Sequence, residues 1–175
     1  MAIQTSGAQS DGTQAGNLMK GGKYLTFQLD KEIYGLAILK VQEIIGMMSV
    51  THIPRTPEYI RGVINLRGKV ITVVDLRRKF GMEAKEVTEK TCIVVVQVGK
   101  NSHHITMGTI VDEVSEVLDI NPNQMEPPPE FGGNAGVDFL QGIGKVNQKV
   151  VMLLDIDKVL TSKEMALVDE ASQKT

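Results

Sequence analysis

Residues 59–80, YIRGVINLRGKVITVVDLRRKF, align without a gap with residues 139–160, FLQGIGKVNQKVVMLLDIDKVL. Most core positions are apolar in both stretches, and aliphatic residues precede the aspartate of each. Valine and isoleucine favour β-strands. Four identical pairs stand at matching positions: Gly62 and Gly142, Lys69 and Lys149, Val70 and Val150, Asp75 and Asp155. The stretch therefore predicts one strand-rich unit that occurs twice in the chain.

A shorter match lies upstream of each copy. VQEI at residues 41–44 corresponds to VDEV at residues 111–114, with an offset of 70 residues, whereas the longer blocks are offset by 80. The ten extra residues fall in the second copy, around the loop NPNQMEPPPEFGGNAG, whose proline and glycine content is typical of irregular structure. Valine-rich strands resemble one another, so chance similarity between unrelated strands is the alternative interpretation.

Alternating and buried strand patterns predict an all-β fold. In YLTFQL, residues 24–29, Leu25, Phe27 and Leu29 form one face of a strand. Apolar runs at residues 70–74, 92–98 and 150–154 predict buried strands. Two lobes of this size bury little core alone, so we expect them to pack together around a binding groove. The predicted core includes Leu25, Phe27, Val73, Val95 and Leu153.

The termini differ in character from the predicted lobes. The first 22 residues contain five glycines and are expected to form a disordered arm. Thr161 and Glu164 have the spacing of a capping box, which predicts a C-terminal helix. A short helix is also expected from Thr56 to Gly62. The expected units are a disordered arm at 1–22, lobes at 23–88 and 89–160, and a C-terminal helix and tail at 161–175, with exchange of strands between the lobes left open.

Composition argues against several classes of protein. The formal net charge of −2 does not favour a polyanion as the main partner. A single cysteine, Cys92, cannot form an internal disulfide, which fits a reducing cytoplasm. No signal peptide or apolar run long enough to span a membrane is evident.

The sequence contains few of the residue patterns that support catalysis. No metalloprotease, redox, nucleophile-elbow or phosphate-loop motif occurs. His103 and His104 are adjacent, and consecutive strand side chains point to opposite faces, so they are poor ligands for one metal. Cys92 lies in a valine run and is interpreted as inert core. We therefore expect no enzyme activity, no cofactor and no metal site.

Basic residues gather in the first copy, where RRK at 77–79 follows Arg61, Arg67 and Lys69. A nucleic-acid-binding small barrel would interleave aromatic residues for base stacking, and only Phe80 is close in sequence. The cluster is therefore interpreted as a solvated basic face, with a nucleic-acid-binding small β-barrel as the alternative function.

Arg67 lies in NLRG, between two predicted strands, where a hairpin turn is expected. The second copy has KVNQ at the aligned positions, with neither an arginine nor a glycine. Because the repeated fold does not require the arginine, we interpret Arg67 as a recognition residue. Asp75 and Asp155 recur after a strand in both copies, which favours turn or cap chemistry.

Three blocks carry a resemblance to a known family. IYGLAILKVQEI, IPRTPEYIRGVINLRGKVITVVDLRRKFG and the terminal EMALVD resemble CheW, the coupling-protein family of bacterial chemotaxis, from about Lys23 to Asp169. The resemblance implies two packed, five-stranded, SH3-like β-barrels and no catalysis. It also implies a cytoplasmic adaptor in membrane-bound receptor arrays, joining the cytoplasmic tip of methyl-accepting chemoreceptors to the regulatory domain of the histidine kinase CheA.

Family positions associated with partner binding carry over by motif. They fall on Val41, Glu43, Gly62, Arg67 and Val117. One departure is visible, since the family commonly has proline where Thr72 stands. Proline lacks the backbone donor of an ordinary strand residue, so Thr72 puts the local geometry of that strand in doubt.

Overall fold

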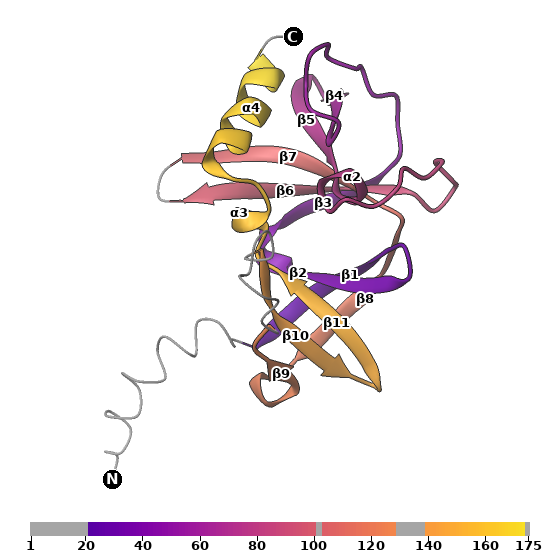
Figure 1. Ribbon diagram of the computed structural model, residues 1–175, viewed down its shortest axis with the longest axis vertical. Coiled ribbons are helices and arrows are strands. Elements are labelled where there is room, and N and C mark those ends of the chain that lie inside the picture. The colour runs from indigo at the N-terminus through magenta and orange to yellow at the C-terminus, as the bar shows by residue number, and fades with distance from the viewer. Residues whose placement is uncertain (1–20, 101–102, 129–138, 174–175) are drawn as a thin grey trace.

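The computed structural model describes residues 21–100, 103–128 and 139–173, which form an upper and a lower half built mainly of β-strands (Figure 1). The strands are β1 (Gly22–Leu29), β2 (Glu32–Ala37), β3 (Val41–Gly46), β4 (Ile60–Leu66), β5 (Lys69–Asp75), β6 (Cys92–Lys100), β7 (His103–Val111), β8 (Glu113–Ile120), β9 (Met125–Glu126), β10 (Leu140–Val146) and β11 (Lys149–Leu154). The helical elements are η1 (Ile38–Lys40), α2 (Leu76–Lys79), η2 (Pro122–Gln124), α3 (Ile156–Val159) and α4 (Ser162–Gln173). The expected arm at 1–22 lies outside the described residues up to position 20, and β1 already begins at Gly22.

The strands form two sheets. The five-stranded sheet has the order β3-β6-β7-β5-β4, and the six-stranded sheet has the order β8-β1-β2-β11-β10-β9. Each contains one parallel pair, β5 with β7 and β11 with β2. The expected all-β fold of two subdomains is confirmed. The six-stranded sheet exceeds the expected five strands because the two-residue β9 pairs with β10.

The two internal copies exchange strands. Each sheet combines the first two strands of one copy with later strands of the other, so β1 and β2 lie beside β8 and β11, while β6 and β7 lie between β3 and β5. Strands that match in the sequence alignment occupy the same place in the two sheets: β3 matches β8, β5 matches β11, and β4 matches β10. The boundary between the two sheets therefore does not fall between residues 88 and 89. The chain crosses from one sheet to the other at η1 in the first copy and at Asp112 in the second copy.

Three clusters of buried side chains hold this arrangement together. The central core lies between the sheets and includes Phe27, Leu36, Val94 and Val96, and each sheet encloses a smaller core, with Leu153 in the six-stranded one. Consecutive residues of β6 alternate between the central core and the core of the five-stranded sheet, so both faces of this strand are buried. This explains the uninterrupted valine run. All five predicted core residues are buried.

Aromatic rings connect the two halves. Phe27 of β1 stacks on Tyr34 of β2, with ring centroids 6.0 Å apart, and Tyr34 in turn stacks on Phe80, which follows α2. Phe80 stacks on Phe139 at 4.7 Å, just before β10. A chain with 4% aromatic residues thus places these four where the sheets meet, and they contribute to the contact between the halves.

Helix α4 begins with a capping box and is held by side-chain contacts with α2 and β5. The Thr161 hydroxyl accepts from the Glu164 amide, and the Glu164 carboxylate accepts from the Thr161 amide, which confirms the predicted capping box. Lys79 donates to both oxygens of Glu164 at 2.7 and 2.8 Å. The buried Thr72 hydroxyl donates to the carbonyl of Val168 at 2.7 Å. The threonine that departs from the family pattern therefore tethers α4 to β5.

The pKa of Tyr59 is raised and the pKa of Glu164 is lowered where these two side chains meet beside α4. Burial, together with the Glu164 carboxylate beside it, raises the pKa of Tyr59 to about 12. Burial also acts to raise the pKa of Glu164, but hydrogen bonds from Lys79 and Thr161 and the charge of Lys79 bring it below its ordinary value. Glu164 is therefore held as a carboxylate near neutral pH.

One local prediction needs correction, and the short helices α2 and α3 were not predicted. No helix forms at 56–62, because the Thr56 hydroxyl donates to the carbonyl of Ile53, and β4 begins at Ile60. Asp75 and Asp155 each accept a hydrogen bond from the amide two residues on, which begins α2 and α3 and confirms their role as caps. Across the described ranges, no helix has both the length and the apolar character to cross a membrane.

Candidate functional site

The β4–β5 hairpin presents Arg67 at its tip. Arg67 and Gly68 have φ angles of 53° and 88°, the left-handed pair that a two-residue type I′ turn requires. The Asn65 side chain accepts a hydrogen bond from the Gly68 amide at 2.8 Å, which closes the turn. An arginine rarely adopts this backbone conformation. The equivalent turn of the other sheet places Asn147 at φ 52°, so the fold requires the conformation but not the arginine.

The Arg67 guanidinium donates to the carboxylate of Glu43. Glu43 lies on β3, at the opposite edge of the five-stranded sheet from β4, so the pair joins the two outer strands. The arginine side chain is 67% exposed, whereas the glutamate side chain is 26% exposed. The contact therefore leaves guanidinium surface available to a partner while its direction is set by Glu43.

Gly62 lies where the same two edges approach through the backbone. The amide and carbonyl of Thr51 each form a 2.8 Å hydrogen bond with Val63, which pairs the segment after β3 with β4. A Cβ at Gly62, whose φ is 145°, would stand 2.1 Å from the Thr51 carbonyl oxygen. Any side chain would push this segment away. Gly62 therefore closes the rolled sheet and has no side chain to offer a partner.

The remaining expected site residues lie in different sheets. Val41 begins β3, opposite Val96, and packs partly buried against the central core. Val117 lies on β8, the outer strand of the six-stranded sheet, opposite Leu25, and is 48% exposed. The structure thus brings Glu43 and Arg67 together, places Gly62 at the seam between the same outer strands, and leaves Val117 on the other sheet.

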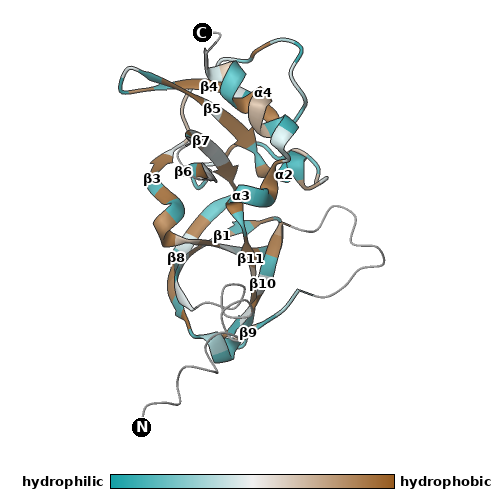
Figure 2. Cartoon of the chain, turned by 90° about the vertical axis from the view of Figure 1, so that its left-hand side faces the viewer, coloured by the Kyte–Doolittle hydropathy of each residue, from teal (hydrophilic) through white to brown (hydrophobic). Residues whose placement is uncertain are grey.

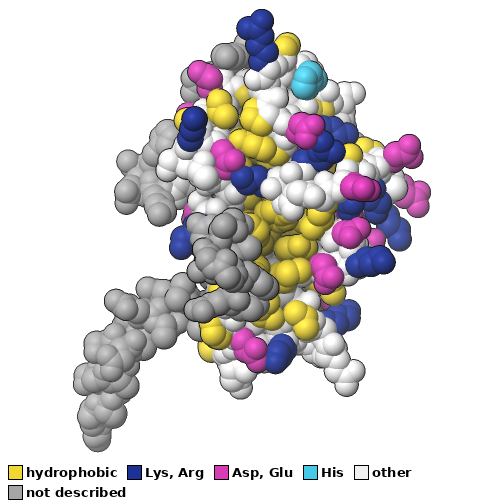
Figure 3. Space-filling view, in the orientation of Figure 1, with side chains coloured by type: hydrophobic (Ala, Val, Ile, Leu, Met, Phe, Trp, Pro, Cys, Tyr) yellow, Lys and Arg dark blue, Asp and Glu magenta, His cyan; other side chains and the backbone are white. Residues whose placement is uncertain are grey.

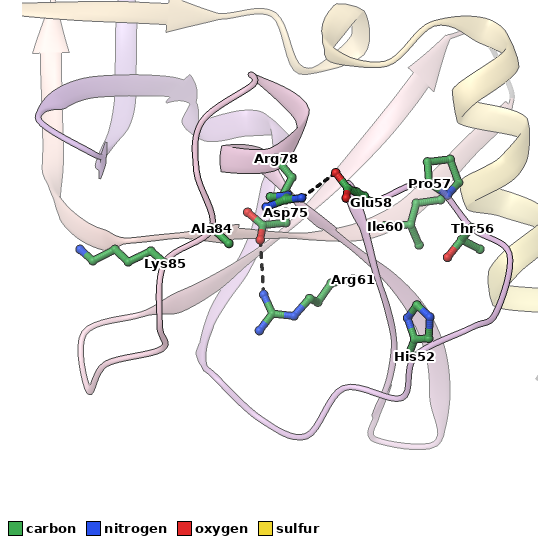
Figure 4. Close-up of a pocket in the computed structure, with 10 residues that line it drawn as sticks. All are labelled: His52, Thr56, Pro57, Glu58, Ile60, Arg61, Asp75, Arg78, Ala84 and Lys85. Carbon is green, nitrogen blue, oxygen red and sulfur yellow. Dashed lines mark hydrogen bonds and ion pairs between the residues drawn. The ribbon is translucent and has the colours of Figure 1, made fainter.

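A pocket of about 360 Å³ lies beside β4 and α2 (Figure 4). Arg61 reaches Asp75 at 3.3 Å, and Arg78 reaches Glu58 at 2.6 Å. The apolar side chains of Pro57, Ile60 and Ala84 also line it, together with His52, Thr56 and Lys85. Sequence reasoning missed this pocket, because its residues come from four separate stretches of the chain.

The basic cluster is only partly the solvated face that was expected, because Arg67 and Lys69 are exposed whereas Arg77 is buried. Arg77 is 9% exposed and donates to Asp112 at 2.7 Å. Lys79 is held by Glu164, and Arg61 and Arg78 by the pocket carboxylates. In the part of the chain that the structure describes, no three histidine, cysteine or acidic side chains are placed to hold a metal ion.

Hydrophobic side chains are exposed in a band between the upper and lower halves on the face shown in Figure 3, with acidic and basic side chains around it. Figure 2 shows that β5 in the upper half and β11 in the lower half consist mainly of hydrophobic residues. Large apolar side chains that remain exposed include Leu39 on η1 and Ile44 on β3. Contiguous apolar surface of this kind marks sites of protein interaction.

Comparison with known proteins extends over most of the chain. The family model described as the CheW-like domain matches residues 23–164. The chemotaxis protein CheW of Klebsiella aerogenes is 41% identical over 153 residues, covering 87% of this chain and 90% of that protein. The chemotaxis protein CheW of Bacillus subtilis is 30% identical over 154 residues, covering 86% and 96%.

A solved structure has the same fold. The crystal structure of the scaffolding protein TtCheW from Thermoanaerobacter tengcongensis is similar to this chain with a TM-score of 0.73 and 37% identity. The similarity covers 83% of this chain and 97% of the other.

Proposed function

The chain belongs to the CheW-like domain family, and from this membership we propose that it is a non-catalytic chemotaxis adaptor. In the proposed role it couples the cytoplasmic tips of methyl-accepting chemoreceptors to the regulatory domain of the histidine kinase CheA. It would act in the cytoplasm, recruited to receptor arrays at the membrane. Its relatives are named as chemotaxis proteins, and one as a scaffolding protein, which supports the proposal.

The observation that carries the proposal is the placement of Arg67. The arginine occupies a backbone conformation that arginine disfavours, at the tip of a hairpin, and its guanidinium is oriented by Glu43. The equivalent turn keeps the conformation with Asn147. A residue that holds an unfavourable backbone conformation, with an exposed and oriented side chain, is expected where recognition requires that side chain.

The other expected binding residues take different parts in the proposal. Glu43 orients Arg67, and Val41 and Val117 supply apolar contact area on the outer strands β3 and β8. Gly62 acts indirectly, by allowing the segment that contains Thr51 to close against β4. A substitution at Gly62 would therefore weaken partner binding through the shape of the sheet.

The charge arrangement supports an adaptor over the nucleic-acid-binding alternative. Counterion release drives nucleic-acid binding and needs lysine and arginine free to meet phosphates. Here Arg61, Arg77, Arg78 and Lys79 each form an ion pair with a carboxylate of this chain. Their charge is largely neutralised within the fold.

The test is reconstitution of kinase control. The protein is mixed with CheA and receptor-containing membranes from the same organism, and co-sedimentation and CheA autophosphorylation are measured on the same samples. We expect the protein to sediment with the membranes and to raise kinase activity well above that of CheA with membranes alone.

Arg67→Ala is the test variant, and Lys69→Ala is its matched control, because Lys69 is exposed on the same hairpin. We expect Lys69→Ala to behave as the wild type and Arg67→Ala to lose stimulation. Failure of the wild-type protein to bind either partner would refute the adaptor role. Tight RNA binding that weakens steeply with salt would instead support the alternative.

A further inference from the structure

Arg77 and Asp157 occupy equivalent positions in the two internal copies. Each donates its amide to the aspartate two residues before it, Asp75 or Asp155, and so stands in the first turn of α2 or α3. Each side chain then reaches one of the two crossovers where a copy passes between the sheets. Arg77 is positively charged and contacts the carboxylate of Asp112. Asp157 is negatively charged and contacts the ammonium group of Lys40.

We call the contact between Arg77 and Asp112 the first clamp, and it is buried. Arg77 donates from Nη1 to Asp112, the residue between β7 and β8, at 2.7 Å. The same carboxylate accepts from the amide of Asp30, in the β1–β2 turn, at 2.8 Å. The side chains of Arg77 and Asp112 are 11% and 8% exposed. This clamp joins α2, the crossover and the six-stranded sheet.

The second clamp involves Asp157. One carboxylate oxygen forms an ion pair with Nζ of Lys40 at 2.8 Å, and the other accepts a hydrogen bond from the amide of Gly99 at 3.0 Å. Lys40 is the last residue of the crossover η1, and Gly99 lies near the end of β6. The side chains of Lys40 and Asp157 are 35% and 17% exposed, so solvent reaches this clamp more readily than the first.

The position of the second clamp matters for β3. Lys40 directly precedes Val41, and β3 pairs with β6 through Val41 and Glu43. Asp157 therefore holds the beginning of β3 through Lys40 and the neighbouring strand through Gly99. Because α3 continues from β11, these contacts tie β3 to the six-stranded sheet.

We propose that Asp157 and Lys40 are positioning residues that set the orientation of β3, with Val41 and Glu43, relative to the six-stranded sheet. The inference rests on the proposed adaptor function for its effect on partner binding. Neither residue needs to touch a partner. The buried Arg77–Asp112 clamp holds the other crossover, so loss of the more exposed clamp changes the angle between the sheets while the fold persists.

The test variants remove charge and little volume. Asp157→Asn keeps an oxygen that can accept from Gly99 but loses the attraction for Lys40, and Lys40→Met removes the same pair from the other side. Asp119→Asn is the matched control, because Asp119 pairs with Lys23 at 2.9 Å across two strands of one sheet. Lys40→Arg keeps the charge and serves as the conservative rescue.

The orientation of β3 relative to the six-stranded sheet is measured on the protein alone, without any partner. Spin labels are attached to cysteines introduced at the exposed Ile44 on β3 and the exposed Lys149 on β11, one on each sheet, in a Cys92→Ser background. Pulsed electron resonance then gives the distribution of label distances. We expect Asp157→Asn and Lys40→Met to broaden or shift the distribution, and Asp119→Asn and Lys40→Arg to preserve it. An unchanged distribution in both test variants would overturn the proposal, whatever happens to binding.

Partner affinity is measured on unlabelled proteins with a soluble CheA regulatory domain. Each test variant should bind about three- to tenfold more weakly, as expected for residues that act through an intervening element. The double variant should be no weaker than the single ones, because both remove one interaction. A changed distance distribution with wild-type affinity in both variants would contradict the positioning role. If the wild type itself fails to bind CheA and receptors, the adaptor function fails, and the label distances alone decide whether the clamp sets the orientation of β3.

Discussion

The guanidinium of Arg67 donates to the carboxylate of Glu43, and this contact joins the β4–β5 turn to the far edge of the same sheet. The pair is 24 residues apart in the chain and meets because the five-stranded sheet rolls until β3 approaches β4. Glu43 thereby orients a side chain whose backbone conformation is unfavourable for arginine. The unfavourable backbone conformation of Arg67 affects the stability of the protein, whereas its exposed guanidinium is available for binding. Substitutions at Arg67 can therefore test the two effects separately.

Replacing Arg67 by asparagine should weaken binding and leave the fold intact. Asparagine tolerates the left-handed conformation and already occupies the equivalent position at Asn147. The free energy of unfolding should therefore stay within about 0.5 kcal/mol of the wild type, or rise. Loss of charge-assisted hydrogen bonds to a partner should cost about 1.5–3 kcal/mol of binding free energy. That is roughly a ten- to hundredfold loss of affinity.

The measurement pairs calorimetric titration of a soluble partner fragment with urea unfolding of the same samples. A soluble fragment is needed because avidity in an array masks part of the loss. Unchanged affinity for both CheA and a receptor fragment would show that Arg67 takes no part in recognition.

Gly62→Ala should destabilise the protein through the backbone. The added Cβ would stand 2.1 Å from the Thr51 carbonyl oxygen, so the segment after β3 must shift and lose its pairing with Val63. We expect a loss of about 1–3 kcal/mol in the free energy of unfolding. Gly68→Ala is the control, because Gly68 has a φ of 88° but open space around its Cβ position. Equal losses in the two variants in urea unfolding would argue against the clash.

Arg77→Met should be the most damaging change in the basic cluster. It leaves the buried Asp112 carboxylate without its closest cation, and breaking a buried ion pair costs about 3–5 kcal/mol. Arg78→Met removes an arginine whose partner Glu58 is 81% exposed, so its cost should be about 0–1 kcal/mol. Urea unfolding midpoints of the two variants check the contrast. Similar midpoints would mean that solvent or Lys85 compensates Asp112.

Glu164 should make the stability of the protein depend on acidity. Its pKa is lower in the folded state than the ordinary value of 4.5, so its contribution is fully present above about pH 4.5. The contribution is lost as pH falls through the lowered folded pKa. The difference in melting temperature between the wild type and Glu164→Gln should therefore shrink as pH falls below 4.5. A difference that stays constant from pH 6 to pH 3 would contradict this assignment.

Local patterns predicted much of the fold. Burial of Leu25, Phe27, Val73, Val95 and Leu153 follows from strand periodicity and apolar runs, and the structure confirms it. The caps at Asp75 and Asp155 and the capping box before α4 also follow, because each links residues two or three apart. The helix expected at 56–62 was wrong, because its capping signal was used by a turn that leads into a strand.

The candidate site was predicted less completely. The resemblance placed Arg67 and Glu43 among the binding residues, but it did not reveal that they contact each other. The pocket beside α2 and the burial of Arg77 were not foreseen, since a run of basic residues carries no information about which carboxylates lie opposite. Thr72 seemed a local departure and instead bonds to a helix 96 residues away.

The sequence by itself determined that one strand-rich unit occurs twice, which residues of each strand are apolar, and where the caps lie. Those features depend on neighbours within a few positions, where spacing alone decides which side chains share a face. The tertiary structure alone decided that the copies exchange strands, and that Arg67 meets Glu43, Arg77 meets Asp112, and Asp157 meets Lys40. An exchanged and an unexchanged arrangement can bury the same apolar faces, so the hydrophobic pattern does not distinguish them. The choice between them appears in contacts between residues far apart in the chain, whose proximity exists only after the sheets have packed.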